Sequence, residues 1–143
     1  MTPAPAPYAL PHRHVLTLST GPGAVRVAGE TVEKALGEWG IGERHPAAVG
    51  PALLILGELV ANSVRHAAAA SPQTTVVYAA GPDCLVLVVH DRHPHRPDLT
   101  GPRAAGTGGL ATVMELTYAP GGTAVVRGDP DGPGKSIWIT LPA

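Results

Sequence analysis

The stretch Leu53–Ala67, LLILGELVANSVRHA, constrains the fold of this 143-residue chain more than any other part of the sequence. An α-helix advances by about 100° per residue, so its aliphatic and polar side chains would fall on separate faces. The two faces would be Leu53, Leu56, Val60 and Val64 against Glu58, Asn62, Arg65 and His66. This pattern is typical of a helix whose apolar face packs on a core.

The polar face of this helix carries a carboxylate, a carboxamide and an imidazole at a strict spacing of four, in Glu58, Asn62 and His66. Side chains four residues apart lie above one another on a helix, so the three would form a single stripe. A solvated helix face with a His near the helix end explains the same pattern. The stretch alone leaves both interpretations open.

The rest of the chain predicts strands and helices around this helix. The patterns favour strands over 15–20, 74–80, 84–90, 123–127 and 136–141, and helices over 24–39, from 46–51 to about 69, and over 110–118. We expect the first strand at a sheet edge and residues 42–46 as a polar connection. The strand over 84–90 is almost wholly apolar, so it should be central, in a hairpin with the strand before it.

Length and composition indicate one domain and exclude several classes of protein. We divide the chain into a flexible lead, 1–14, and one folded domain, 15–143. A net charge of −1 argues against nucleic acid as the main partner. No uninterrupted apolar run reaches the roughly 18 residues of a membrane span, and the lead lacks the apolar segment of a signal peptide. The single cysteine, Cys84, excludes an internal disulfide and fits a reducing, cytoplasmic location.

Two further features follow the polar stripe along the chain. Asp91 closes the buried strand, and the Gly-rich turn 106–109, GTGG, opens a helix. Asn and Glu oxygens suit Mg²⁺, and a carboxylate beside that metal can act as a general base. A carboxylate at a strand end can accept a hydrogen bond from an exocyclic amine such as that of adenine. Backbone N–H groups of a Gly-rich turn at a helix start can bind phosphate.

A loop of about fifteen residues, Arg92–Gly106, separates Asp91 from the Gly-rich turn. It has no periodicity, and long loops inside compact domains are usually functional or mobile. We expect it to be a lid that nucleotide orders, with its prolines dividing it into a few stiff pieces.

Four motifs in this order, ELVANSVRHA, VVHD, GTGGLATV and GKSIWITLP, resemble the ATP-binding domain shared by histidine kinases, gyrase and Hsp90-type ATPases. Over residues 15–141 the chain is more closely similar to single-domain serine-kinase anti-sigma factors and related small ATP-binding regulatory proteins of actinobacteria. The resemblance implies a Bergerat-type α/β (α+β) two-layer sandwich, with a mixed, mainly antiparallel sheet covered on one face by about three helices.

The resemblance also implies roles for individual residues, with ATP and Mg²⁺ as cofactors. Asn62 would ligate Mg²⁺, Glu58 would be the catalytic general base, and Asp91 would bind the adenine amine. The other nucleotide-binding positions would be His66, Gly106, Thr107, Gly108, Gly109, Leu110 and Ser136, the last beside the adenine. His66 would support the site from the helix end.

Two functions fit this resemblance. One is a serine/threonine-protein kinase that regulates transcription by phosphorylating a sigma factor or an anti-sigma factor antagonist. The resemblance leaves open whether the chain forms a homodimer. The other is a non-catalytic nucleotide-binding module that sequesters its partner stoichiometrically. Glu58 favours the kinase. The family pattern D-x-G-x-G is replaced here by Asp91-Arg92-His93-Pro94-His95, which favours the binding module.

A metal site is the alternative from a different class. His90, His93 and His95, with His12 and His14 in the lead, could offer imidazoles. A zinc site needs three or four converging ligands, and the chain has no Cys pair to supply them. We therefore favour a solvated loop as the explanation of these histidines.

Overall fold

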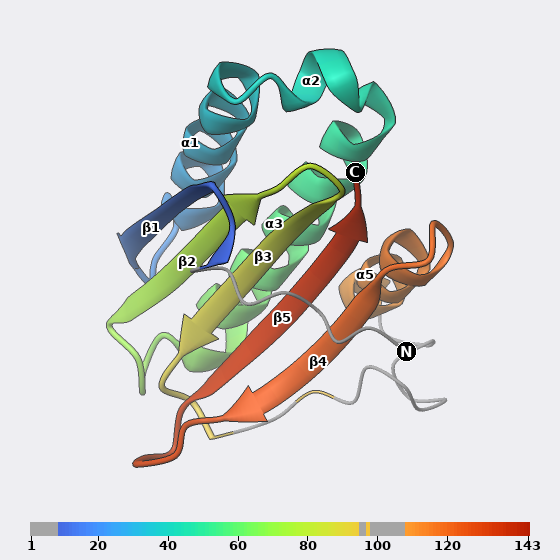
Figure 1. The fold of residues 1–143 in the computed structure, drawn as a ribbon. Helices are drawn as coiled ribbons and strands as arrows, with labels where there is room; N and C mark the ends of the chain where they lie inside the picture. The colour runs from blue at the N-terminus through green and yellow to red at the C-terminus, as the bar shows by residue number, and fades with distance from the viewer. Residues whose placement is uncertain (1–8, 95–96, 98–107) are drawn as a thin grey trace.

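The computed structural model of the chain describes residues 9–94, 97 and 108–143. They form a two-layer sandwich of one five-stranded sheet and a layer of helices (Figure 1). The elements in chain order are β1 (His12–Ser19), α1 (Ala24–Glu38), α2 (Ile41–Arg44), α3 (Pro46–Ala67), β2 (Gln73–Ala80), β3 (Cys84–Asp91), α5 (Gly108–Tyr118), β4 (Thr123–Gly128) and β5 (Lys135–Pro142). The predicted fold class is confirmed.

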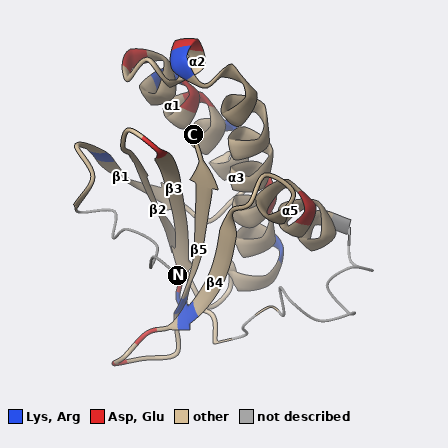
Figure 2. Cartoon of the chain, turned by 45° about the vertical axis from the view of Figure 1, so that its right-hand side comes forward, with Lys and Arg blue, Asp and Glu red and all other residues tan. Residues whose placement is uncertain are grey.

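The sheet has the strand order β1-β2-β3-β5-β4, and all four pairings are antiparallel. The predicted edge position of the first strand, the β2–β3 hairpin and the central position of β3 are confirmed. β3 lies in the middle, between β2 and β5, and its side chains Leu85–Val89 are buried in succession, as the apolar run predicts. Figure 2 shows the helices on one side of the sheet, with charge concentrated on the helices and at strand ends.

Two boundaries differ from the sequence prediction. Residues 41–44 form the short helix α2, which overlaps the predicted polar connection 42–46, because Gly40 has a φ of 74° and turns the chain sharply out of α1. Ile41 is fully buried and anchors α2 to the core. β1 begins at His12, three residues before Val15, because His12 already pairs with β2 opposite Ala80. Residues 12–14 therefore belong to the sheet and not to the predicted lead.

Helix α3 is the central helix of the layer and packs against both α1 and α5. Pro46 occupies its first turn, where a missing N–H costs little, and Pro51 lies inside the helix. By length and composition alone this 22-residue helix could cross a membrane. Its fully buried side chains, including Ile55, Leu56 and Val60, belong to the protein core, which accounts for much of its apolar composition.

The two-residue period of the strands decides which side chains face the helices. In β5 the alternation sends Ile137, Ile139 and Leu141 into the core, and Lys135 shares their face. In β3 the side chains of Leu85, Leu87 and Val89 point to the same core, and Asp91 continues that series. The two charged residues at the lower end of the sheet therefore lie on its helix-covered face.

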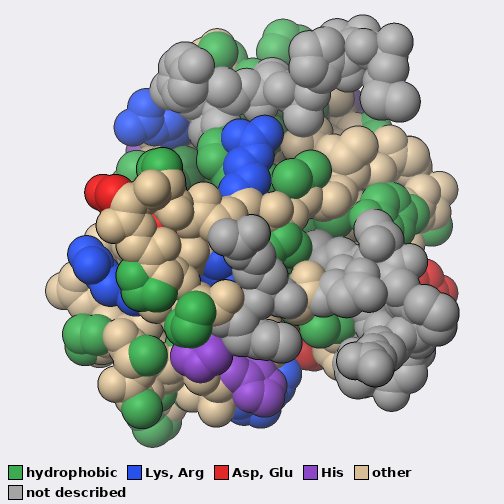
Figure 3. Space-filling model, turned by 90° about the horizontal axis from the view of Figure 1, so that it is seen from below, with side chains coloured by type: hydrophobic (Ala, Val, Ile, Leu, Met, Phe, Trp, Pro, Cys, Tyr) green, Lys and Arg blue, Asp and Glu red, His purple; other side chains and the backbone are tan. Residues whose placement is uncertain are grey.

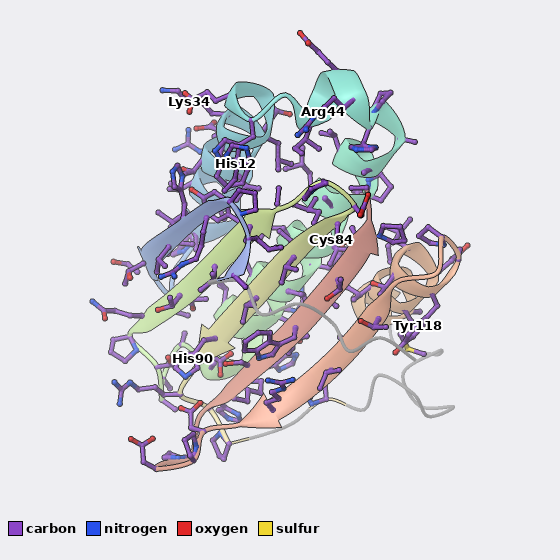
Figure 4. The ribbon with its side chains drawn as sticks, in the orientation of Figure 1. His12, Lys34, Arg44, Cys84, His90 and Tyr118 are labelled. Atoms are coloured by element: carbon purple, nitrogen blue, oxygen red, sulfur yellow. The ribbon has the colours of Figure 1, made fainter. Side chains whose placement is uncertain are left out.

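Cys84 begins β3, and His90 lies near the other end of the same strand (Figure 4). Burial and the neighbouring Asp83 charge raise the pKa of its thiol, and a hydrogen bond with the Gly81 backbone offsets this in part. Because the thiolate is the nucleophile, we predict slow alkylation at neutral pH. Iodoacetamide rates measured against pH should give a higher midpoint for the folded protein than for the same protein in denaturant. An equal or lower midpoint would contradict this assignment.

Candidate functional site

At the lower end of the sheet in Figure 1, α3 contacts the end of β3 through Asp91, which also contacts the start of β5; earlier along α3, Glu58 lies against the start of α5. Figure 3 views the molecule from this end, where histidine side chains lie beside basic ones and few acidic atoms are visible. The exposed residues Arg65 and His66 close α3, and Arg92 follows β3. The positive charge of this end suits an anionic ligand.

Asp91 is the centre of the hydrogen-bond network at this end. Its carboxylate is only 3% exposed and accepts bonds from a hydroxyl, an ammonium and a backbone amide. Ser63 Oγ donates to Oδ2 over 2.7 Å, Lys135 Nζ donates to Oδ1 over 2.7 Å, and His93 N donates to Oδ1 over 3.0 Å. Removing two charges from water costs several kcal/mol each, so these contacts are needed to offset the burial of the pair.

The local fold explains why these groups meet. Asp91 and Lys135 are directly opposite each other in the antiparallel β3–β5 register and face the helix layer together. Ser63 lies on the buried face of α3, where it is 3% exposed. The pair of strand ends and the central helix are therefore joined through one carboxylate.

The turn between β4 and β5 holds Lys135 in place. Asp129 N donates to Gly134 O over 2.9 Å, and His90 Nε2 lies 2.9 Å from Asp129 Oδ2. A Cβ on Gly134 would lie 2.8 Å from Asp91 O and would also collide with the Asp129 carboxylate. Only glycine lets the turn approach the end of β3 this closely.

We predict that Gly134→Ala destabilises the protein by about 1–3 kcal/mol, the usual cost of forcing extra volume into a packed site. The matched control is Gly132→Ala in the same turn, where an added Cβ meets nothing within 4 Å. Urea unfolding should leave the control within about 0.5 kcal/mol of the native protein. Equal stability of the two variants would show that the turn accommodates the added methyl group without a measurable cost, which would contradict the prediction.

Glu58 lies against the first turn of α5. A Cβ built on Gly109 would lie 3.1 Å from Glu58 Cδ and closer still to its carboxylate oxygen. The N-terminal end of a helix carries partial positive charge, which favours a carboxylate at this position. The structure thus brings together two predicted site residues that are 51 positions apart in the sequence, Glu58 and Gly109.

The other predicted residues divide into three groups. Asn62 lies one helical turn beyond Glu58 and immediately before Ser63, and it is partly buried; His66 is exposed in the last turn of α3. Gly108 and Leu110 lie in the first turn of α5. Gly106 and Thr107, with most of the loop predicted as a lid, lie outside the described residues.

Ser136 does not join Asp91. The alternation of β5 places Ser136 opposite His90, on the face of the sheet away from the helices. The β5 residue that contacts Asp91 is Lys135. The prediction that Ser136 lies beside the adenine gains no support from this contact.

Sequence reasoning missed two residues of the network, Ser63 and Lys135. Lys135 has a signal in the sequence, because the apolar Ile137, Ile139 and Leu141 share its parity and identify its face as the core face. Ser63 follows Asn62 directly and falls on the apolar side of the helix, where a small hydroxyl residue suggests a buried hydrogen bond.

The alternative metal site gains no support from the described histidines. His90 pairs with Asp129, while the rings of His12 and His14, which belong to β1, lie 5.2 and 5.1 Å from the Trp39 ring. Within 9–94, 97 and 108–143, no group of three or more His, Cys, Asp or Glu residues is placed to hold a metal ion. His95 lies outside those ranges.

A separate cavity of about 720 Å³ lies at the other end of the molecule. It opens between the start of α3, the end of α5 and the end of β5, and residues such as Pro46, Leu116 and Leu141 line it. None of the predicted site residues lines this cavity. The residues around this cavity therefore serve as a control region in an experiment that locates a bound ligand.

No protein-family model matches the chain, and no curated protein matches it. Solved structures do match. The histidine kinase domain of the Erythrobacter litoralis blue-light activated histidine kinase is 21% identical, with a TM-score of 0.51 over 66% of this chain and 44% of that one. Full-length ShkA, solved in complex with AMPPNP, is 20% identical, with a TM-score of 0.54 over 83% of this chain and 29% of that one. The Acinetobacter baumannii histidine kinase AdeS is 15% identical, with a TM-score of 0.50 over 90% and 67%.

These likenesses concern the fold. The chain has the α/β sandwich of histidine kinase domains, with the antiparallel sheet and the helix layer in the same arrangement. It spans 44% of the length of the first of these structures and 29% of the second.

Proposed function

We propose that this chain binds ATP with Mg²⁺ and transfers the γ-phosphoryl group to a serine or threonine of a regulatory partner protein. The observation that carries the proposal is the double attachment of α3. Ser63 ties this helix to Asp91 at 2.7 Å, and Glu58, little more than a turn earlier, lies against Gly109. Asn62 lies between the two attachments. The shared fold with ShkA, which was solved with AMPPNP, supports the same assignment.

The residues present fit a magnesium ion that is shared with phosphate. Asn62 would offer one oxygen ligand from the partly buried face of α3. Mg²⁺ keeps several waters and usually takes only one or two protein ligands beside substrate phosphates, so a larger acidic cluster is not required. Bound there, the ion would neutralise charge on the phosphate oxygens.

Glu58 is the general base in this proposal. Its carboxylate would accept the proton of the partner's hydroxyl while that oxygen bonds to the γ-phosphorus and ADP leaves. The first turn of α5 would donate backbone N–H groups to the phosphates. The exposed Arg65 and Arg92 would add positive charge around them.

The non-catalytic alternative keeps a specific observation in its favour. Among the described residues, Asp91 already accepts three hydrogen bonds, so a nucleobase would find few acceptor sites on it. A chain that binds nucleotide weakly would act by holding its partner and not by turnover. For either function we propose a cytoplasmic protein whose partner is a sigma factor or an anti-sigma factor antagonist.

Calorimetry with ATP, in the presence of Mg²⁺ or of a chelator, tests the proposal. The native protein should bind, and Asn62→Ala should weaken binding only when Mg²⁺ is present, because the variant lacks a metal ligand. The chelated titration is therefore the matched control. Absence of binding by the native protein at millimolar ATP would refute the proposal, and equal loss with and without metal would remove Asn62 as the ligand.

A further inference from the structure

We propose that the Lys135 ammonium occupies the position on Asp91 that a nucleotide's amine would take, and that nucleotide binding must displace it. This inference rests on the proposed function and deepens it. It makes Lys135 the residue that sets nucleotide affinity at this site.

The first step is the acceptor capacity of Asp91. An ionised carboxylate has about four lone-pair positions for hydrogen bonds. Ser63, His93 N and Lys135 occupy three of them, and two of the three fall on Oδ1. The side chains of Asp91 and Lys135 are 3% and 5% exposed. One position, on Oδ2, has no described donor, but the pair is buried, so an amine that approaches Oδ1 must displace one of these donors.

The second step is which donor can move. The His93 donor is backbone, and Ser63 is fixed on a buried turn of α3. The Lys135 backbone is fixed as well, in the β3–β5 and β4–β5 pairings. Its ammonium, however, stands on a flexible four-carbon stem. Lys135 is therefore the donor that can leave Asp91 without any movement of the backbone.

The third step is chemical equivalence. Lys135 Nζ donates to Oδ1 over 2.7 Å, in the manner of a ligand N–H group. A nucleobase amine would replace the charged Lys135 donor by a neutral one, and the displaced Lys135 ammonium would have to be solvated again. The exchange lowers affinity, so removing Lys135 should strengthen nucleotide binding although it weakens the fold.

Calorimetric titration of MgATP into Lys135→Thr, Lys34→Thr and the native protein tests this. Lys34 is the other lysine of the chain and stands exposed on α1, so it is the matched control (Figure 4). We expect at least tenfold tighter binding by Lys135→Thr and unchanged binding by Lys34→Thr. If the native protein binds MgATP and Lys135→Thr binds it equally or more weakly, the inference is overturned and the proposed function stands. No binding by either protein would overturn both.

A measurement on the native protein avoids any loss of folding in the variant. With ¹⁵N-labelled lysine, the Lys135 ammonium should give a signal protected from solvent exchange, which Lys34 should lack. Saturating MgATP should abolish that protection. A Lys135 signal that keeps its shift and protection at saturation would overturn the inference.

Discussion

Lys135→Met is expected to lower the free energy of unfolding by about 3–5 kcal/mol, because it leaves the Asp91 carboxylate as a buried charge without its counter-ion. The two side chains are 5% and 3% exposed and 2.7 Å apart, so solvent cannot take over the role of the ammonium. Urea unfolding followed by circular dichroism measures the loss. Lys34→Met, which removes an exposed lysine, should change stability by less than about 0.5 kcal/mol.

The double variant Asp91→Asn with Lys135→Met separates the ion pair from its surroundings. The carboxamide that replaces the Asp91 carboxylate can still accept the bonds from Ser63 and His93 N, and neither buried charge remains. The double variant should therefore lose much less stability than the sum of the two single variants. Additive losses, or a Lys135→Met loss below about 1 kcal/mol, would mean that the two charges do not depend on each other.

Glu58→Gln is expected to lower the rate of phosphoryl transfer by about 10²–10⁴-fold, the usual contribution of a general base. Glutamine keeps the shape of the side chain beside Gly109, so nucleotide affinity should change little. Incorporation of label from γ-labelled ATP into candidate partner proteins gives the rate. Glu115→Gln, an exposed position on α5, is the control.

The outcome of this experiment also decides between the two proposed functions. If Glu58→Gln transfers the phosphoryl group at the native rate, Glu58 is not the general base. A native protein that binds nucleotide without measurable turnover would favour the non-catalytic module.

Much of the fold could be predicted because periodicity is a local signal. The helices α1 and α3 and the buried strand β3 are long enough for their apolar spacing to identify them. The helix α2 has four residues, too few to show a helical period, and its cause is the positive φ of Gly40. His12 and its pairing partner Ala80 are far apart in the sequence, so the start of β1 can be identified only when the pairing of the strands is known.

The site was predictable in part for the same reason. The spacing of Glu58 and Asn62 places them on one helix face, and Asp91 ends a strand whose apolar run is plain in the sequence. Motif position favoured Ser136, but the strand's two-residue period assigns the inward position to Lys135. A lysine on a core face is rare without a partner, and only the β3–β5 register identifies that partner as Asp91.

Hydrogen exchange with and without saturating MgATP tests most directly the claim that nucleotide binds along α3, between its contacts with α5 and with Asp91. Amides of the α3 segment around Glu58 and Asn62, of Arg92 and His93, and of the first turn of α5 should exchange more slowly with nucleotide. Amides around the cavity at the other end, near Pro46 and Leu116, should not change. Protection confined to that cavity, or protection at neither end with nucleotide bound, would contradict the account.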